Sequence, residues 1–420
     1  MQGSAEIISI GTELLLGDIL NSNAQFLAQE LASLGIPHHF QTVVGDNPQR
    51  IQSVLKTACS RAQLLIFTGG LGPTPDDLTT EAIANFFGAD LEERPDVLAD
   101  IEAKCAQRGR KMLASIKKQA LLPVGADVLP NPIGTAPGII WQPAPDITVM
   151  SFPGVPTEMK AMWLATAAPY LHNNGWSSGV ILSRMLKFWG VSESALVKQI
   201  GSFLHQENPT VAPYANLGEV KLRVTAKART SDAAVQLITP IEAELKQRTG
   251  LNCYGTDEDT LASVVGEQLS AHGHTLSVAE SCTGGGLGQM LTAIPGSSVY
   301  FYGGVIAYDN LIKEKVLGVN PLVLKTDGAV SQPVAEQMAL GVQKLLSTDW
   351  ALSITGIAGP GGGSPQKPVG LVYVGLATPE KIAHSFMYRF GSSLSREQIR
   401  QMSAHSALDQ LRRRLLRNSF

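Results

Sequence analysis

The stretch LLIFTGGLGPTPDDLTTEAIANFFG, residues 64–88, points to the class of fold. Its opening residues are apolar and predict a short buried strand that ends near Gly70. A glycine-rich loop follows, and DDLTTEAIANFFG then predicts a helix with Asp76 and Asp77 at its positive end. The order of strand, glycine loop and helix is typical of an α/β domain.

The flanking sequence repeats this order. Apolar strands are predicted at residues 6–10 and 38–44, and helices at residues 21–35 and from 46 to about 62. Strands and helices that alternate at this spacing indicate a doubly wound, mostly parallel sheet with helices on both faces. We assign residues 1–172 to this first domain.

Two further domains are expected, because a chain of 420 residues is too long for a single core. Residues 173–252 contain a helix that begins near Ser192, a strand and a second helix, which together indicate a small α/β module. Residues 256–420 again alternate strands and helices, with VGLVYVGLA as the last predicted strand and an amphipathic helix after it.

The overall composition argues against several classes of protein. A formal net charge of −3 does not fit a broad basic surface for a phosphate backbone, so nucleic acid is not an expected partner. The N-terminus has no signal-peptide pattern and no apolar run has membrane length, so we expect a cytoplasmic protein without membrane contact. The cysteines lie far apart without a CxxC pair, which argues against a disulfide framework and a zinc site: Cys59, Cys105, Cys253 and Cys282.

The stretch AESCTGGGLG, residues 279–288, places two nucleophile types side by side at the end of a predicted strand. Ser281 is either an ordinary cap of the helix that follows or a nucleophile whose oxyanion is held by the unpaired N–H groups of that helix. No histidine lies near a motif of this domain, so Lys313 is the better candidate for a general base, and an ordinary solvated lysine is the alternative. We interpret Cys282 as a small packing residue, because cysteine catalysis commonly relies on a histidine.

The loop TGIAGPGGGSPQKPVG, from Thr355 to Gly370, follows another apolar strand. It lacks the Gly-x4-Gly-Lys-Ser/Thr pattern and is therefore not an NTPase phosphate loop. Its backbone N–H groups, together with the Thr355 hydroxyl, are suited to a phosphate monoester. A flexible surface loop is the alternative interpretation.

The motifs AESCTGG, PGSS, GG-x-x-AY-x-N-x-x-K, GAVS, TGIAGPGGG and KPVG, in this order, resemble the C-terminal domain of the CinA family. Members of that family hydrolyse nicotinamide mononucleotide to nicotinic acid mononucleotide and ammonia. By this resemblance Ser281 is the nucleophile, Lys313 is its base and Tyr308 assists. The family's phosphate-binding arginine lies in an F-x-G-D-R motif that reads FGSSLSR here, so Arg396 is the candidate and Arg400 the alternative. The other implied pocket residues are Thr283, Gly284, Ser298, Thr355, Gly356 and Gly359.

The implied amidase reaction requires no metal or cofactor. Ser281 attacks the amide carbon while Lys313 takes its proton, helix-start N–H groups hold the oxyanion, and ammonia leaves. Water then hydrolyses the acyl-enzyme.

The first domain offers a second candidate site, at two loops that follow parallel strands. Ligands of doubly wound sheets bind at the carboxyl ends of such strands. Glycines in the second loop permit close approach of a phosphate to the backbone: Gly69, Gly70 and Gly72. Four acids are suited to hold a divalent metal on that phosphate: Glu13, Asp18, Asp76 and Asp77. Without a metal, Asp76 and Asp77 would only stabilise the start of a helix, and Glu13 would only be an exposed surface acid.

The segments GTELLLGD, TGGLGPTPDDLT, NPIGTAPG and FPGVPTEM resemble the molybdopterin-binding fold in the version found at the N-terminus of the CinA family. That version is associated with a metal-dependent ADP-ribose pyrophosphatase, which uses Mg²⁺, Mn²⁺ or Co²⁺ and yields AMP and ribose 5-phosphate. The resemblance implies that Gly69 to Thr74 contact the phosphates, that Asp76 and Asp77 lie near the metal, and that Glu13 and Asp18 face them.

The central module resembles the KH-like insert of the family. No GxxG loop lies between two helices there, so a structural or dimerisation role is favoured over RNA binding. The family associates as dimers, which implies a homodimer. Two alternatives stay open: a first domain that binds a nucleotide or pterin without chemistry, and an interaction factor of competence or recombination.

Overall fold

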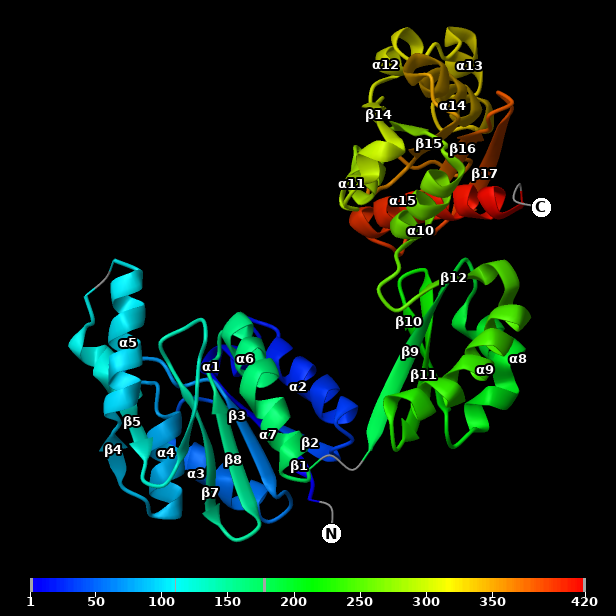
Figure 1. The fold of residues 1–420 in the computed structure, drawn as a ribbon. Coiled ribbons are helices and arrows are strands. Elements are labelled where there is room, and N and C mark those ends of the chain that lie inside the picture. The colour runs from blue at the N-terminus through cyan, green and yellow to red at the C-terminus, as the bar shows by residue number, and fades with distance from the viewer. Residues whose placement is uncertain (1–2, 110, 177–178, 418–420) are drawn as a thin grey trace. The chain divides into compact units, whose positions relative to one another are not determined.

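The computed structural model describes residues 3–109, 111–176 and 179–417 (Figure 1). It divides into two compact units, one formed by residues 1–182 with 226–237 and the other by residues 183–225 with 238–420. The predicted α/β class is confirmed, because strands and helices alternate along most of the chain. None of the helices in the described ranges is long and apolar enough to span a bilayer.

The first domain is built on a mixed sheet. Its strands are β1 (Ala5–Ile10), β2 (His38–Val44), β3 (Leu64–Thr68), β6 (Asp127–Leu129), β7 (Gly138–Ala144) and β8 (Ile147–Phe152), and β4 (Leu91–Glu93) pairs separately with β5 (Leu121–Pro123). The order in the sheet is β2, β1, β3, β8, β7, β6. β3 is parallel to both of its neighbours, and β2 is parallel to β1, whereas β6 and β7 form an antiparallel edge. The sheet is therefore mostly parallel, as predicted.

Helices cover both faces of this sheet. One face carries α2 (Ser22–Ser33), α6 (Pro156–Met162) and α7 (Ala168–Asn173). The other face carries α3 (Pro48–Cys59), α4 (Thr79–Phe87) and α5 (Pro95–Gln107). The short helix α1 (Thr12–Leu16) lies in the loop after β1. Successive side chains of β3 alternate between the two cores: Leu64 and Ile66 pack on one face, Leu65 and Phe67 on the other. Each buried side chain contributes about 1.5–3 kcal/mol to folding, which explains the uninterrupted apolar run.

The central module is an antiparallel sheet with two helices. Its elements are β9 (Val180–Trp189), α8 (Glu193–Ile200), β10 (Thr210–Asn216), β11 (Glu219–Ala228), α9 (Ser231–Thr249) and β12 (Cys253–Thr256). The strand order is β10, β11, β9, β12. Ser192 caps α8, since its side chain accepts the Ala195 N–H at 3.2 Å. The predicted start of this helix is confirmed.

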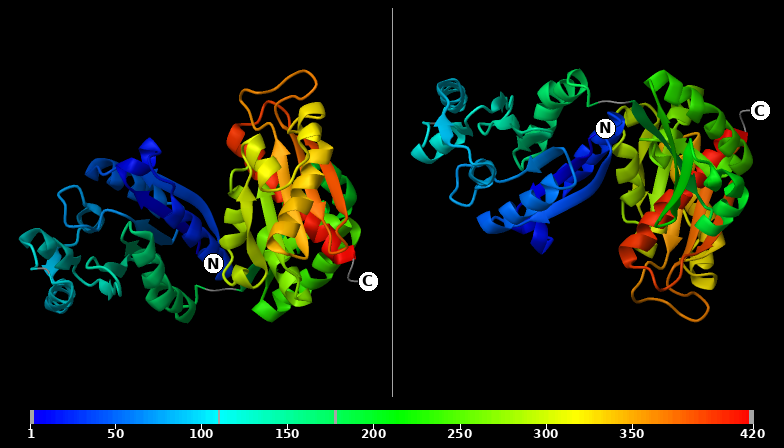
Figure 2. Two further views of the ribbon diagram at one scale, coloured as in Figure 1. Left: turned by 90° about the horizontal axis from the view of Figure 1, so that it is seen from above. Right: turned by 90° about the horizontal axis from the view of Figure 1, so that it is seen from below.

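The C-terminal domain is again a sheet between helices. Its strands are β13 (Leu276–Glu280), β14 (Phe301–Ile306), β15 (Trp350–Gly356), β16 (Leu371–Ala377) and β17 (Ala383–Arg389), in the order β14, β13, β15, β16, β17. Its helices are α10 (Leu261–His272), α11 (Gly286–Thr292), α12 (Asn310–Lys315), α13 (Pro321–Thr326), α14 (Gln332–Leu346) and α15 (Arg396–Arg417). α14 packs on one face of the sheet, and α10 and α15 pack on the other (Figures 1 and 2).

The prediction that VGLVYVGLA forms the last strand is wrong. That segment is β16, and β17 follows it and pairs with it in antiparallel register from Ala383 to Arg389. β17 lies at the edge of the sheet, where its side chains alternate between partial burial and exposure. An edge strand of this kind carries polar residues and lacks the apolar run that marks a central strand.

Candidate active site

Two neighbouring strands end beside the predicted nucleophile. β13 and β15 are parallel, with Glu280 opposite Ile354, so both strands open to the same edge of the sheet. Ser281 follows β13 directly, and its N–H donates to the Ile354 carbonyl at 2.9 Å. A pocket of about 280 Å³ lies at this edge. Its lining contains the predicted residues Ser281, Tyr308, Lys313, Thr355, Gly356, Gly359 and Arg396.

A buried carboxylate occupies the helix start that was predicted to hold the oxyanion. Glu280 is 2% exposed, and its carboxylate accepts the N–H groups of Gly285 and Leu287, each at 3.0 Å, and of Gly288 at 2.8 Å. These groups surround the start of α11, so the prediction that they hold the oxyanion is wrong. The alternative prediction, a cap by Ser281, is not observed either, because Glu280 performs that function.

Other donors are available closer to the nucleophile. Within the part of the chain that the structure describes, the Thr283 N–H has no hydrogen-bond partner, and the Cys282 N–H contacts only the sulfur of its own side chain. The N–H group directly after a nucleophile is a common oxyanion donor in enzymes that form acyl intermediates. The turn between Ser281 and α11 therefore offers donors that the start of α11, bonded to Glu280, does not.

Lys313 is buried rather than solvated. It is 1% exposed, and its ammonium nitrogen donates to the carbonyls of Ala307 at 2.8 Å and Tyr308 at 3.1 Å. Burial lowers the pKa of Lys313, and the nearby Asp309 carboxylate opposes that shift. A lowered pKa favours the neutral amine that a general base requires. Among the described residues Ser281 Oγ forms no hydrogen bond, to Lys313 or to any other group, so both lie at the pocket without a direct link.

Cys282 does not suit nucleophilic catalysis. It is 6% exposed and packs in the core with Leu287 and Leu291. Burial raises the pKa of the Cys282 thiol to about 12, with Glu280 adding to the shift. The thiol therefore stays protonated near neutral pH, and a protonated thiol is a poor nucleophile.

The two candidate arginines lie on the first turns of α15 and differ in position. Arg396 lines the pocket, and it donates to the Gly359 carbonyl at 2.7 Å and to the Tyr308 hydroxyl at 3.0 Å. Arg400 is not part of the lining, and its guanidinium donates to the Thr283 carbonyl at 2.7 and 3.3 Å. The geometry thus favours Arg396 as the residue that meets a ligand, with Arg400 supporting the turn after Ser281.

The remaining predicted pocket residues divide into two groups. Thr355 lines the pocket and donates its hydroxyl to the Ala329 carbonyl at 2.7 Å. Gly359 has a φ of 79°, a left-handed conformation that favours glycine. Three residues lie outside the lining: Thr283 is fully buried, Gly284 adopts a φ of 57°, and Ser298 is exposed on a short helical turn.

The sequence analysis missed several residues that line the pocket and one buried acid that holds the start of α11. Asn310, Ala329 and Val330 line the pocket from the loops before α12 and α14. Glu280 was also missed, although the signal was present: an acid directly precedes Ser281, and glycines follow where a helix begins.

The first domain has a larger pocket, of about 500 Å³, at the carboxyl ends of β1, β3 and β8. Its lining includes Gly69, Gly70, Gly72, Glu13, Asp76 and Asp77, and it omits Asp18 and Thr74. Gly69 has a φ of 99°, and a Cβ atom there would lie 2.1 Å from the Ile10 carbonyl oxygen. The glycine therefore allows the loop to pass directly over the end of β1.

The predicted acids do not gather into a metal centre. α4 begins at Thr79, and the Asp77 carboxylate accepts the Thr74 N–H at 2.8 Å and also its hydroxyl. Among the described residues there is no group of three or more metal-ligating side chains, so a four-acid site is not formed. Glu13 and Asp76 still line the pocket. This arrangement suits an ion such as Mg²⁺, which one or two carboxylates hold on a phosphate, and does not suit an ion held by protein alone.

The lining of this pocket also contains polar residues that the sequence analysis did not name. Asp46, after β2, accepts the N–H of Thr12 at 2.9 Å and its hydroxyl at 2.8 Å. Gln119 and Glu158 also belong to the lining. Glu158 lies within the quoted segment FPGVPTEM, but the sequence analysis gave it no function of its own, and only the fold brings these three distant residues to the same edge.

The chain matches three family models in succession. A probable molybdopterin binding domain matches residues 6–173, a damage-inducible protein CinA KH domain matches residues 183–255, and a CinA C-terminal domain matches residues 258–415. A CinA-like protein of Nostoc punctiforme is 64% identical over 413 residues, 98% of this chain and 99% of that protein. The chain belongs to the CinA family. A CinA-like protein of Trichormus variabilis has the same identity and coverage.

Solved structures of CinA proteins match shorter parts of the chain. The competence/damage inducible protein CihA of Agrobacterium tumefaciens is 40% identical and covers 36% of this chain and 91% of its own, with a TM-score of 0.35. The protein CinA of Thermoplasma acidophilum is 34% identical and covers 40% of this chain and 97% of its own, with a TM-score of 0.37. Membership of the CinA family therefore rests on the full-length sequence comparisons.

Proposed function

We propose that the C-terminal domain hydrolyses the carboxamide of nicotinamide mononucleotide to nicotinic acid mononucleotide and ammonia. The observation that carries this proposal is the placement of Ser281 and the buried Lys313 in one pocket with Arg396. A serine with a neutral lysine base is a known arrangement for acyl transfer. An arginine at the opposite wall supplies a partner for the nucleotide phosphate.

The reaction proceeds by acyl transfer to Ser281. Ser281 Oγ forms a bond to the carboxamide carbon, and its proton passes to Lys313 Nζ. The N–H group of Cys282, directly after the nucleophile, donates to the oxyanion, and collapse of the tetrahedral intermediate releases ammonia with the proton returned by Lys313. Water then attacks the ester as its proton passes to Lys313, and Lys313 gives that proton to Ser281 Oγ as the acid product leaves.

Variants of neighbouring residues test this proposal. Ammonia release from nicotinamide mononucleotide is measured for the wild type, Ser281→Ala and the matched control Cys282→Ala. We expect Ser281→Ala to lose activity by at least about a thousandfold, in the range seen for removed nucleophiles, and Cys282→Ala to keep most of it. An active Ser281→Ala variant would sink the proposal, as would the absence of ammonia release from the wild type.

A second activity is proposed for the first domain: cleavage of ADP-ribose to AMP and ribose 5-phosphate with Mg²⁺, Mn²⁺ or Co²⁺. The large pocket with Gly69, Gly70, Glu13 and Asp76 supports it, because glycine backbone and carboxylates suit a diphosphate and its counterion. The test is AMP formation with each metal. Binding of ADP-ribose without AMP would instead favour a domain that binds nucleotides without chemistry.

A further inference from the structure

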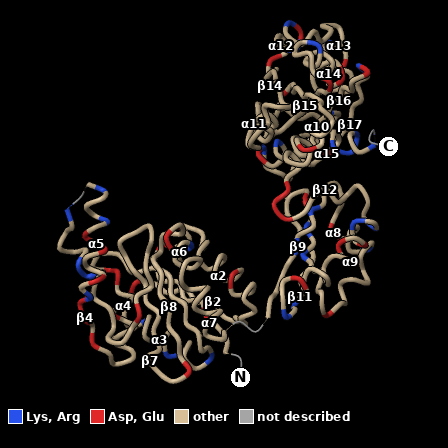
Figure 3. Tube along the Cα trace, viewed as in Figure 1, with Lys and Arg blue, Asp and Glu red and all other residues tan. Residues whose placement is uncertain are grey.

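The C-terminal domain has another pocket, between β17 and the last turns of α15. Its volume is about 400 Å³, within the range of small-molecule sites. Three arginines of α15 line it, Arg413, Arg414 and Arg417, and Phe386 of β17 belongs to the opposite wall. Figure 3 shows basic residues, in blue, near the C-terminus.

This pocket is separate from the candidate active site. Arg396, which lines the active-site pocket, is the first residue of α15, whereas Arg413 to Arg417 are in its last turns. With a rise of about 1.5 Å per residue, the two ends of the helix lie roughly 25 Å apart. A ligand at the far end therefore does not occupy the active-site pocket.

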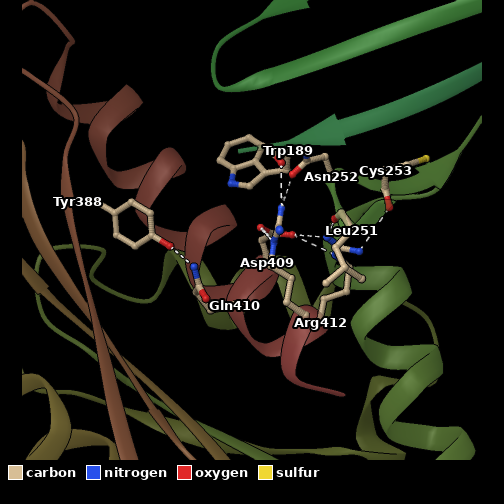
Figure 4. Close-up of polar contacts among 9 residues, drawn as sticks. Trp189, Leu251, Asn252, Cys253, Tyr388, Asp409, Gln410 and Arg412 are labelled. Atoms are coloured by element: carbon tan, nitrogen blue, oxygen red, sulfur yellow. Dashed lines mark hydrogen bonds and ion pairs between the residues drawn. The ribbon is translucent and has the colours of Figure 1, made fainter. Parts of the chain in front are cut away.

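One of the three arginines already has structural partners. Arg413 Nε donates to the Asp409 carboxylate at 2.6 Å, and its Nη2 donates to the Trp189 carbonyl at 3.3 Å and to Asn252 at 3.2 Å. Arg412 beside it is fully buried and bonds Asp409 at 2.7 Å, as Figure 4 shows. This network joins α15 to the central module, so Arg413 is a fixed wall of the pocket rather than a free cation.

The other two arginines lack such partners. In the described residues neither Arg414 nor Arg417 forms an ion pair or a hydrogen bond, and Arg414 Nε is a buried donor with nothing to accept it. Basic residues at a helix C-terminus often bond the last carbonyls, but among the described residues up to Arg417 the two side chains form no such bond. The lining holds one acid, Glu336, which accepts an amide N–H from Gln332 at 3.1 Å. The exposed Glu380 carboxyl forms no ion pair with Arg414 among the described residues, but the pKa of Glu380 is lowered by a hydrogen bond from Thr378 and, to a smaller extent, by the charge of Arg414.

We propose that this pocket binds a small phosphate ester, with the phosphate on Arg414 and Arg417 and the organic part against Phe386. Residues three apart on a helix share a face, so the two guanidinium groups present their donors to the same space. Guanidinium donors match phosphate oxygens in bidentate geometry, and a buried unpaired N–H such as Arg414 Nε requires an acceptor. The site is independent of the amidase activity proposed above.

Calorimetric titration of the full chain tests this site, with inorganic phosphate and phenyl phosphate as probes. Because phosphate can also enter the two nucleotide pockets, four proteins are compared: wild type, the double variant Arg414→Gln with Arg417→Gln, Arg396→Gln, and Arg50→Gln, which removes one exposed charge on α3 and so matches Arg396→Gln. The expected result is that the double variant loses one binding site per chain, or binds it about tenfold more weakly. Arg396→Gln and Arg50→Gln keep that site.

Phe386→Ala separates the phosphate from the organic part of the ligand. Wild type is expected to bind phenyl phosphate more tightly than inorganic phosphate at this site, and Phe386→Ala to remove the difference. Equal phosphate binding by wild type and the double variant would overturn the proposal. The proposal would also be overturned if Arg396→Gln lost the phosphate site while the Arg414/Arg417 double variant kept it. An unchanged melting temperature shows that each variant is folded, and unchanged ammonia release shows the same for the variants that lie outside the active-site pocket.

Discussion

The contact between Glu280 and the turn after Ser281 yields a quantitative prediction. Glu280→Ala removes the acceptor of three backbone N–H groups, those of Gly285, Leu287 and Gly288. A buried donor left without a partner costs about 1–3 kcal/mol. Water can reach the two glycine groups, which are part-buried, so we expect a total loss of about 3–5 kcal/mol in the local stability of this turn.

Hydrogen exchange measures this loss at the three amides directly. A loss of about 3–5 kcal/mol corresponds to exchange that is faster by roughly a hundredfold to several thousandfold. The matched control is Glu267→Gln, which changes an exposed acid on α10. The turn also holds Ser281 and the N–H groups of Cys282 and Thr283, so ammonia release should fall with it. Unchanged exchange at all three amides in Glu280→Ala would refute the reasoning.

Three further predictions follow from the two pockets. The rate of ammonia release should rise with pH and level off below the pH at which an ordinary lysine titrates. The reason is that burial lowers the pKa of Lys313 and only the neutral amine accepts a proton. A rate that falls as the pH rises towards that of an ordinary lysine would contradict this prediction. Arg396→Gln should raise KM for nicotinamide mononucleotide about tenfold and leave KM for nicotinamide riboside, which has no phosphate, unchanged. Arg400→Gln should not change the ratio of the two KM values. Steady-state kinetics with both substrates measure this ratio. Gly69→Ala should destabilise the first domain by about 1–3 kcal/mol, because the added Cβ would clash with the Ile10 carbonyl. Gly17→Ala is the control, since Gly17 has a φ of 78° but open space around it, and it should reduce the free energy of unfolding by less. The measurement is the thermal unfolding midpoint of each variant.

Local sequence predicted most elements because their signals are local. The run from Leu64 to Thr68 is apolar at every position, as a strand covered on both faces requires. The start of α8 near Ser192 was predicted, and it is fixed by a local bond, because Ser192 and Ala195 are three positions apart in the chain. β17 escaped prediction for the converse reason: an edge strand with alternating exposure has no strong local pattern.

The sequence by itself determined the α/β class, the parallel sheet of the first domain and the candidates Ser281, Lys313 and Arg396, because strand and helix periodicity and short motifs are written along the chain. Only the tertiary structure decided which groups meet. It buried Lys313, set Arg396 rather than Arg400 at the pocket, left Asp18 out of the lining of the first domain's pocket and assigned the start of α11 to Glu280. The physical reason is that burial, pKa and free hydrogen-bond donors depend on neighbours from distant segments, which no local pattern specifies.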